Sequence, residues 1–218
     1  MVAFPLNREL NTSEIFDDIA NALADTGYII LPAALPTDLT DALYLHMKSL
    51  NDEKFRRAGI GRDNQHHVND FVRTDEICWL TGKHSSARAY LDWMESLRLG
   101  LNRRLFLGLF DYESHFAHYG TGAFYKKHRD AFRGNTNRVV TTVFYLNPNW
   151  MVEDGGELVM YSENDEVIER VLPHYGKLVV FLSDRFPHEV LPAGRDRYSV
   201  AGWFRVNNSL GFTVDPPQ

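Results

Sequence analysis

The 218-residue chain contains a single cysteine, Cys78, and no long run of apolar residues. One cysteine excludes an intramolecular disulfide and favours a reducing compartment, so we expect a cytoplasmic protein. No apolar run approaches the roughly 18–20 residues that a membrane-spanning helix needs. The first ten residues also lack the apolar centre of a secretory signal. We therefore expect no membrane partner.

Positive charge is also scarce, with 23 Lys and Arg against 29 Asp and Glu, which gives a net charge of −6. An acidic chain is a poor general binder of polyanions, so we expect no nucleic-acid partner. Aromatic residues are plentiful at 13%, which excludes intrinsic disorder. The length predicts a single domain over residues 1–218.

The first half of the chain has the apolar spacing of helices. Asn11, with an acid at Glu14, predicts a helix start, and Gly27 predicts the end of that helix. A short buried strand should follow at residues 28–31. Two further helices are predicted, one opening at residues 36–37 and one over about residues 87–105. Residues 56–69 are rich in Gly, Asp and Asn and predict a mobile loop.

The second half, from residue 111, has short segments rich in Val, Tyr, Phe and Thr between turn clusters. Such a pattern is typical of an antiparallel sandwich or barrel. The fold class is therefore mainly β with supporting α helices. Residues 1–110 give helical support and a loop, and residues 111–207 form the β core. The candidate strands are 114–119, 123–130, 138–147, 156–161, 166–172, 177–182, 187–191 and 197–206.

A possible metal site begins at His128 and Asp130. Side chains at i and i+2 of a strand point to the same face, so these two should converge. His188, near the start of another predicted strand, is the candidate third ligand. Two histidines and a carboxylate that leave coordination positions open suit non-heme Fe(II). Alone, a His-x-Asp pair is weak, because it also occurs on ordinary solvated strands.

Arg197 lies nine residues after His188, and a hairpin would return it beside the metal. A guanidinium there suits the far end of a dicarboxylate, through bidentate charge-assisted hydrogen bonds. Arg195 competes for this role. We expect a bulge or strand end to be needed for Arg197 and Trp203 to share the pocket. His115 and His118, three residues apart, should face opposite sides of their strand and not chelate together.

The sequence of the chain resembles the 2-oxoglutarate- and Fe(II)-dependent prolyl hydroxylases. Separate blocks agree in order over residues 72–205, and chance does not explain such agreement. The similarity is strongest to the bacterial prolyl hydroxylases that modify elongation factor Tu, and it extends to those acting on the hypoxia-inducible factor. The runs 97–109 and 188–195 are closest to the bacterial group. The blocks are residues 73–79, 119–122, 125–130, 138–147, 154–158 and 188–203.

The resemblance implies a double-stranded β-helix (jelly-roll) core with the metal at one mouth. His128, Asp130 and His188 match the iron ligands. The cosubstrate-binding positions are Arg197 and Tyr145, which hold the far carboxylate of 2-oxoglutarate, together with Thr141, Tyr119 and Trp203. The positions near the peptide are Asp75, Trp79, Tyr125 and Arg138. Residues 56–69 correspond to a loop that covers the substrate.

The implied reaction is hydroxylation of a prolyl residue in a protein substrate to 4-hydroxyproline. Its cofactors are Fe(II), 2-oxoglutarate as cosubstrate and dioxygen, with ascorbate as a candidate further ligand. Elongation factor Tu is the suspected protein substrate. Each lining residue also has a structural alternative: Thr141 and Tyr145 suit an ordinary strand core, and Trp79 and Trp203 suit packing.

Two branches of the family fit less well, and two other functions stay open. Nucleic-acid demethylases of this class carry a second arginine six residues after the first, and here that residue is Trp203. Collagen-type enzymes have Lys in place of Arg197. A hydroxylase of a free amino acid or peptide natural product is the second candidate function. From another class, a non-catalytic cupin-like metal sensor is the third.

Overall fold

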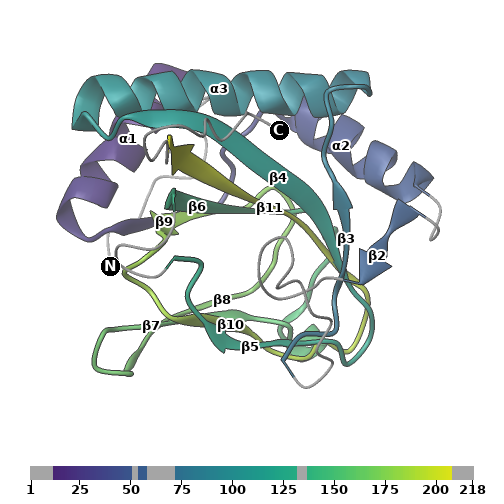
Figure 1. Cartoon of the computed structure of the whole chain (residues 1–218). Helices are drawn as coiled ribbons and strands as arrows, with labels where there is room; N and C mark the ends of the chain where they lie inside the picture. Colours follow the sequence, from purple (N-terminus) through teal and green to yellow (C-terminus); the bar gives the residue numbers. More distant parts are fainter. Residues whose placement is uncertain (1–11, 51–53, 58–71, 132–136, 208–218) are drawn as a thin grey trace.

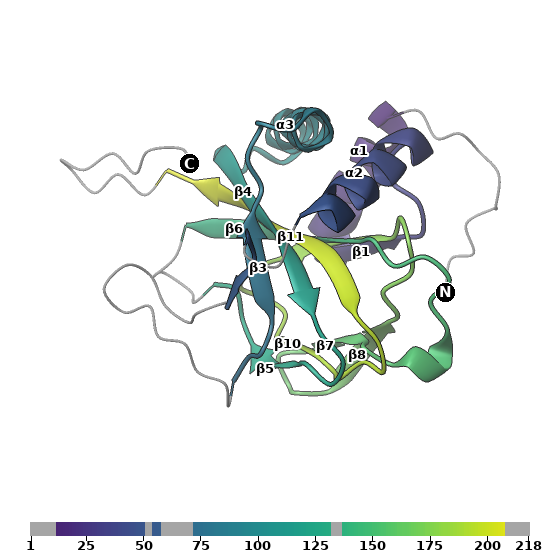
Figure 2. The ribbon, with the colours of Figure 1, turned by 90° about the vertical axis from the view of Figure 1, so that its right-hand side faces the viewer.

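The computed structural model describes residues 12–50, 54–57, 72–131 and 137–207. Helices lie on one side of a large antiparallel sheet, and a smaller sheet lies on the other side (Figures 1 and 2). The expected β-rich fold with supporting helices is confirmed. Among the described residues, none of the helices combines the length and apolarity needed to cross a bilayer.

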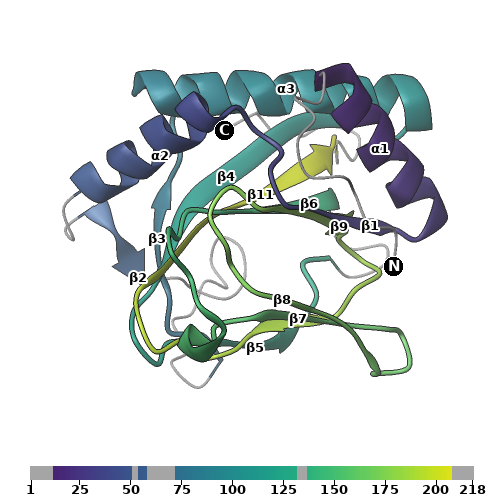
Figure 3. The same cartoon turned by 180° about the vertical axis from the view of Figure 1, so that it is seen from behind.

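Three helices form the outer layer: α1 (Thr12–Asp25), α2 (Thr37–Ser49) and α3 (Ser85–Leu105). Each matches a helix predicted from apolar spacing, with ends within two residues. In α1 the apolar stripe of Ile15, Ile19 and Leu23 is buried, as a 3.6-residue period requires. Figure 3, the view from behind, shows the three helices above the large sheet, on the side away from the small sheet. Helix α3 ends at Leu105 and is capped by Phe106, which adopts the left-handed conformation with φ 55°.

Within the described residues, the large sheet has seven strands in the order β1-β9-β6-β11-β4-β3-β2, and the small sheet has four in the order β5-β10-β7-β8. Every pairing is antiparallel. The predicted strand at residues 28–31 and all eight strands predicted after residue 111 are present. The strands are β1 (Tyr28–Leu31), β2 (Arg56–Arg57), β3 (Glu76–Trp79), β4 (Leu109–Tyr119), β5 (Tyr125–His128), β6 (Arg138–Tyr145), β7 (Leu158–Tyr161), β8 (Val167–Val171), β9 (Leu178–Leu182), β10 (His188–Val190) and β11 (Arg197–Val206).

Strands β2 and β3 were not predicted from the residue pattern. Strand β3 pairs with β4, and the two-residue strand β2 pairs with β3. Arg56 and Arg57, assigned to a loop from composition, are therefore at the edge of the large sheet. The rest of that predicted substrate-covering loop, residues 58–69, lies outside the described residues.

Successive side chains of β11 point to opposite faces of the large sheet, and these faces border two compartments of the molecule. Val200 and Phe204 face the helices and are fully buried in the larger apolar cluster. Arg197, Ser199 and Trp203 face the small sheet, together with Tyr145 of β6 and Tyr119 of β4. The fold therefore assigns one face of the large sheet to packing against helices and the other to the space between the sheets.

Candidate active site

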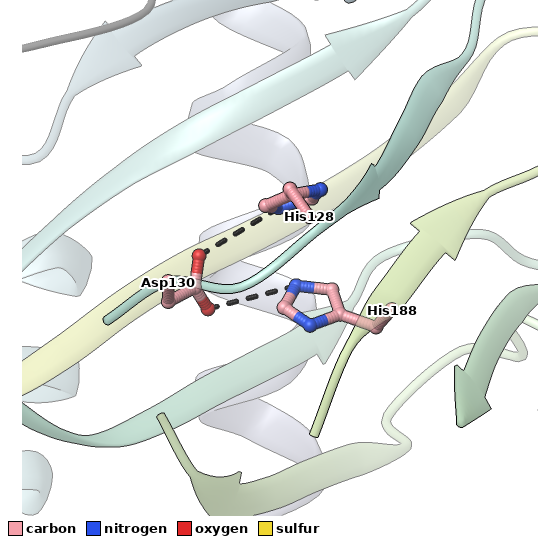
Figure 4. A group of neighbouring side chains, drawn as sticks. All are labelled: His128, Asp130 and His188. Carbon is pink, nitrogen blue, oxygen red and sulfur yellow. Dashed lines mark ion pairs between the residues drawn. The ribbon is translucent and has the colours of Figure 1, made fainter. Parts of the chain in front are cut away.

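Three side chains meet between the two sheets: His128 at the end of β5, Asp130 just after it, and His188 at the start of β10 (Figure 4). One candidate ligand atom from each lies within 4.8 Å of the others. His128 and His188 are direct cross-strand partners, with ring centroids 4.3 Å apart. The carboxylate of Asp130 lies between them, 3.7 Å from His128 Nε2 and 3.6 Å from His188 Nε2. The sequence thus predicted a cluster that the fold brings together.

The prediction that His128 and Asp130 converge because they share one face of a strand is wrong. Strand β5 ends at His128, and Asp130 lies in a bend beyond it, so the two are not same-face neighbours on one strand. A hydrogen bond holds Asp130 instead: Thr141 Oγ1 donates to Asp130 Oδ2 at 2.9 Å. Ser183 Oγ is 2.8 Å from the same threonine hydroxyl. Thr141, expected near the cosubstrate, therefore contacts the carboxylate of the metal cluster.

Backbone carbonyls fix the orientation of both imidazoles. His128 Nδ1 is 2.8 Å from the carbonyl oxygen of Lys126, and His188 Nδ1 is 3.0 Å from that of Phe186. A neutral imidazole donating through Nδ1 presents Nε2 as a lone pair, which is the usual arrangement of metal-binding histidines. Both Nε2 atoms face Asp130, so the three donors point at one location.

Burial and mutual repulsion also set suitable protonation states. Burial, followed by the charge of His188, lowers the pKa of His128. Burial acts to raise the pKa of Asp130, but the charges of His188, His128 and Arg138 lower it overall. At neutral pH the cluster therefore offers a neutral imidazole and a carboxylate. Metal binding requires these deprotonated forms, and two histidines with one carboxylate fit non-heme Fe(II).

Arg197 occupies the interior between the sheets with 1% of its surface exposed. Its guanidinium carbon lies 5.0 Å from the ring centroids of both Tyr119 and Tyr145. Among the described residues, neither Arg197 Nη2 nor the Tyr145 hydroxyl has a hydrogen-bond partner. Burial raises the pKa of Tyr145, although the neighbouring Arg197 guanidinium acts to lower it, so the hydroxyl stays protonated. A buried guanidinium with an unpaired Nη2, beside a hydroxyl donor that has no acceptor among the described residues, fits a carboxylate ligand.

Arg197 and Trp203 share this face without a bulge, contrary to the sequence-based expectation. Strand β11 pairs with β4 in unbroken register from Arg197 to Arg205, and the odd-numbered positions lie on one face. Arg195, the competing arginine, lies outside the site. Its guanidinium packs 5.2 Å from the Trp150 ring centroid, and Nη1 is 3.5 Å from Asp154 Oδ2.

Trp203 forms an aromatic wall of the site together with His115. The Arg138 guanidinium lies 3.6 Å from the Trp203 ring centroid and donates to Glu113. His115 is buried between Trp79 and Trp203, at centroid distances of 5.2 and 5.4 Å. Burial, together with Arg73 and Arg138, lowers the pKa of His115 to about 3. His118 contacts Tyr198 on the opposite face, so the predicted divergence of the two histidines is confirmed.

The residues expected near a peptide line one side of the site. Asp75 is buried in a bidentate ion pair with Arg73, at 2.7 and 2.6 Å. The Arg73 guanidinium also lies over Tyr125, whose ring stacks on His128 at 3.5 Å between centroids. Trp79 is 48% exposed on β3, so its ring is accessible to a ligand.

Sequence reasoning did not identify Ser183 or Gly156 as parts of the site. Ser183 contacts Thr141, and the Gly156 carbonyl accepts from Arg197 Nε at 2.9 Å. The Gly155-Gly156 pair was noted as a turn signal and as part of the block 154–158 that carries the resemblance, without a role in the site. Both residues have positive φ, which explains the glycines, but their contact with Arg197 spans 41 positions and has no local pattern.

Comparisons with known proteins agree with this geometry. Residues 114–205 match the family model of the 2OG-Fe(II) oxygenase superfamily. The hypoxia-inducible factor prolyl hydroxylase of Caenorhabditis elegans is 31% identical over an alignment of 159 residues that covers 65% of this chain. The match spans only 21% of the length of that nematode protein.

Two solved structures are similar over most of the chain. A prolyl-4-hydroxylase of Pseudomonas putida is 40% identical with a TM-score of 0.80, covering 88% of this chain and 100% of that one. A Trichoplax adhaerens prolyl hydroxylase, bound to a peptide fragment of the hypoxia-inducible factor oxygen degradation domain, is 28% identical with a TM-score of 0.74. That match covers 89% of this chain and 90% of the other. The chain therefore belongs to the 2OG-Fe(II) oxygenase superfamily, in its prolyl hydroxylase family.

Proposed function

We propose that this chain hydroxylates a prolyl residue of a protein or peptide, giving 4-hydroxyproline, with 2-oxoglutarate as cosubstrate. The observation that supports this most is the combination of two features in one compartment. Both histidine Nε2 atoms face Asp130, and the same compartment holds Arg197 Nη2 and the Tyr145 hydroxyl, which are buried and have no hydrogen-bond partner among the described residues. The first feature suits a metal and the second suits a dicarboxylate.

Each residue then has a defined role. His128, Asp130 and His188 would hold Fe(II), and three protein ligands leave coordination positions for a cosubstrate and dioxygen. Bound Fe(II) supplies the oxidative chemistry, in which dioxygen and 2-oxoglutarate give succinate, carbon dioxide and one hydroxyl oxygen on proline. Arg197 would pair with the far carboxylate, and Tyr145 would donate its hydroxyl to the same group. Thr141 keeps Asp130 in position through its hydrogen bond.

The peptide would lie on the side of the site formed by Trp79, Tyr125 and Arg138. Trp79 offers an exposed aromatic face, and Arg138 is held over Trp203 by its contact with Glu113. The ion pair of Arg73 with Asp75 fixes the segment that leads into β3. A peptide-bound neighbour of the same fold, from Trichoplax adhaerens, supports a peptide substrate over a free amino acid.

Elongation factor Tu is our proposed protein substrate. The support for it is the resemblance of residues 97–109 and 188–195 to the bacterial hydroxylases that modify this factor. The Pseudomonas putida relative, at 40% identity, is a bacterial prolyl-4-hydroxylase and agrees with that grouping. The cytoplasmic location expected from the lone cysteine suits such a substrate and stays a prediction.

The test is succinate release from 2-oxoglutarate by the Fe(II)-loaded chain, with and without elongation factor Tu. We expect succinate release to rise when the factor is added, and mass spectrometry to find one added oxygen on a single proline. His128→Ala should abolish both signals. His174→Gln, in the loop between β8 and β9, is the matched control and should retain them.

Other outcomes would redirect the proposal. Full activity of His128→Ala would exclude the metal assignment. Turnover with free proline or short peptides, but not with elongation factor Tu, would favour the second candidate function and exclude this protein substrate. Metal binding without any 2-oxoglutarate turnover would favour a sensor and exclude the enzyme.

A further inference from the structure

Arg197 is held by the protein through one side of its guanidinium. Its Nε–H donates to the carbonyl oxygen of Gly156 at 2.9 Å, while Nη2 has no partner among the described residues. A guanidinium has five N–H donors in a rigid plane, so fixing Nε fixes the direction in which the Nη groups point. The Gly156 carbonyl therefore determines which edge of Arg197 is available to a ligand.

Gly156 makes this contact because it has no side chain. Its φ is 69°, and an added Cβ would lie 2.8 Å from the Cβ of Ala193 and 3.3 Å from the Cδ of Arg197. The same atom would be 3.3 Å from Trp150 Cζ2. The methylene groups of Arg197 thus lie directly against the backbone of Gly156, with no room for a larger residue.

The peptide groups around Gly156 are themselves fixed by hydrogen bonds. The Gly156 N–H donates to the carbonyl oxygen of Pro192 at 3.1 Å. On the preceding residue, the carbonyl of Gly155 accepts from the Trp150 indole Nε1–H at 3.0 Å. Trp150 is 4% exposed, so this support is buried. The cradle of Trp150, Gly155 and Gly156 is therefore rigid behind Arg197.

We propose that Gly156 is a positioning residue for the cosubstrate, acting through Arg197. By occupying Nε, its carbonyl reserves the Nη edge of the guanidinium for the far carboxylate of a five-carbon dicarboxylate, beside Tyr119 and Tyr145. This inference rests on the proposed function, because the ligand is the 2-oxoglutarate of that reaction. It adds a backbone carbonyl, 41 residues earlier in the chain than Arg197, to the residues that set cosubstrate affinity.

The test compares Gly156→Ala with Gly108→Ala. Gly108 has a similar φ of 65°, but no atom of the described part of the chain lies within 4 Å of an added Cβ, so it controls for backbone strain alone. Gly156→Ala should raise the KM for 2-oxoglutarate roughly ten- to a hundredfold, the effect of misplacing a charge-assisted hydrogen bond. Turnover at saturating 2-oxoglutarate and the affinity for Fe(II) should change less than about twofold. Gly108→Ala should keep the wild-type KM.

Two further measurements separate positioning from a general loss of structure. 2-Oxobutyrate lacks the far carboxylate, so its weak binding should be equal in wild type and Gly156→Ala. In an Arg197→Ala background, Gly156→Ala should have no further effect on 2-oxoglutarate, because a residue acting through Arg197 needs it. If Gly156→Ala fails to fold, Trp150→Phe is the substitute test. It removes the indole donor but keeps an aromatic ring, and it should raise the KM for 2-oxoglutarate by a smaller factor.

Each contrary result is distinct. An unchanged KM in both Gly156→Ala and Trp150→Phe would overturn the inference, as would equal weakening of 2-oxoglutarate and 2-oxobutyrate. Additive effects of the Gly156 and Arg197 changes would also overturn it. If the wild-type chain itself fails to bind 2-oxoglutarate, the proposed function fails first, and this inference fails with it.

Discussion

The two faces of the large sheet carry opposite chemistry on the same strands. On the helix face, Val200 and Phe204 are fully buried, and the hydroxyls of Tyr90, Tyr112 and Thr142 contact one another. On the other face, Arg197 Nη2 and the Tyr145 hydroxyl are buried without partners among the described residues. The helix face contributes stability, whereas the inner face keeps polar atoms ready for a ligand at some cost in stability.

The largest effect should come from the helix face. Phe204→Ala removes a fully buried ring that packs against Tyr112 at 4.6 Å between centroids. We expect the free energy of unfolding to fall by about 3–5 kcal/mol, the usual cost of such a cavity. Urea denaturation measures this, and the folded fraction should keep the wild-type KM for 2-oxoglutarate. A stable variant with a changed KM would break the division between the faces.

The next largest effect should come from the inner face and change stability less. Arg197→Met should weaken 2-oxoglutarate binding by about 2–4 kcal/mol, or roughly thirty- to a thousandfold in KM. Among the described residues no carboxylate forms an ion pair with Arg197, so removing the buried charge offsets part of the loss of the hydrogen bond to the Gly156 carbonyl, and the free energy of unfolding should change by less than about 2 kcal/mol. Arg195→Met is the matched control. A raised KM in that control alone would transfer the role to Arg195.

Much of the fold was predictable because it follows local periodicity. The stripe of Ile15, Ile19 and Leu23 predicted α1, and Val- and Tyr-rich segments predicted the β core. Strand β3 was missed because four residues give no clear alternation and its pairing with β4 is non-local. The domain division at residue 110 stays a prediction, although β1, β2 and β3 all come from the earlier part.

The resemblance and the residues together predicted the family, and the comparisons confirm it. The roles of individual residues stay predictions that the geometry supports. Two details were beyond sequence reasoning. Asp130 reaches the cluster through a bend and a bond from Thr141, and Gly156 reaches Arg197 across the fold. Both depend on contacts between segments distant in the chain.

The third prediction concerns the buried imidazole of the inner face. His115 has a pKa of about 3 in the folded chain, lowered first by burial, against about 6.5 when unfolded. Between these pH values the unfolded chain binds the extra proton, so stability falls as pH falls, by up to about 1.4 kcal/mol per pH unit. His115→Met should flatten the dependence of the urea midpoint on pH between about 6.5 and 4. An unchanged slope would show that the imidazole is not the titrating group.

The smallest effect gives the sharpest comparison, because one oxygen atom is removed from each face. Tyr145→Phe deletes a hydroxyl with no partner among the described residues, so stability should hold or rise. The KM for 2-oxoglutarate should rise by the loss of one hydrogen bond, about 0.5–1.5 kcal/mol or roughly two- to tenfold.

Tyr112→Phe deletes a hydroxyl 2.7 Å from Thr142 Oγ1 on the helix face and should do the reverse, lowering stability by about 1 kcal/mol with the KM unchanged. Urea titrations and 2-oxoglutarate kinetics on the two variants measure all four quantities. Equal effects of both variants on KM would mean that the faces are coupled through the sheet, since Thr142 and Tyr145 belong to the same strand β6.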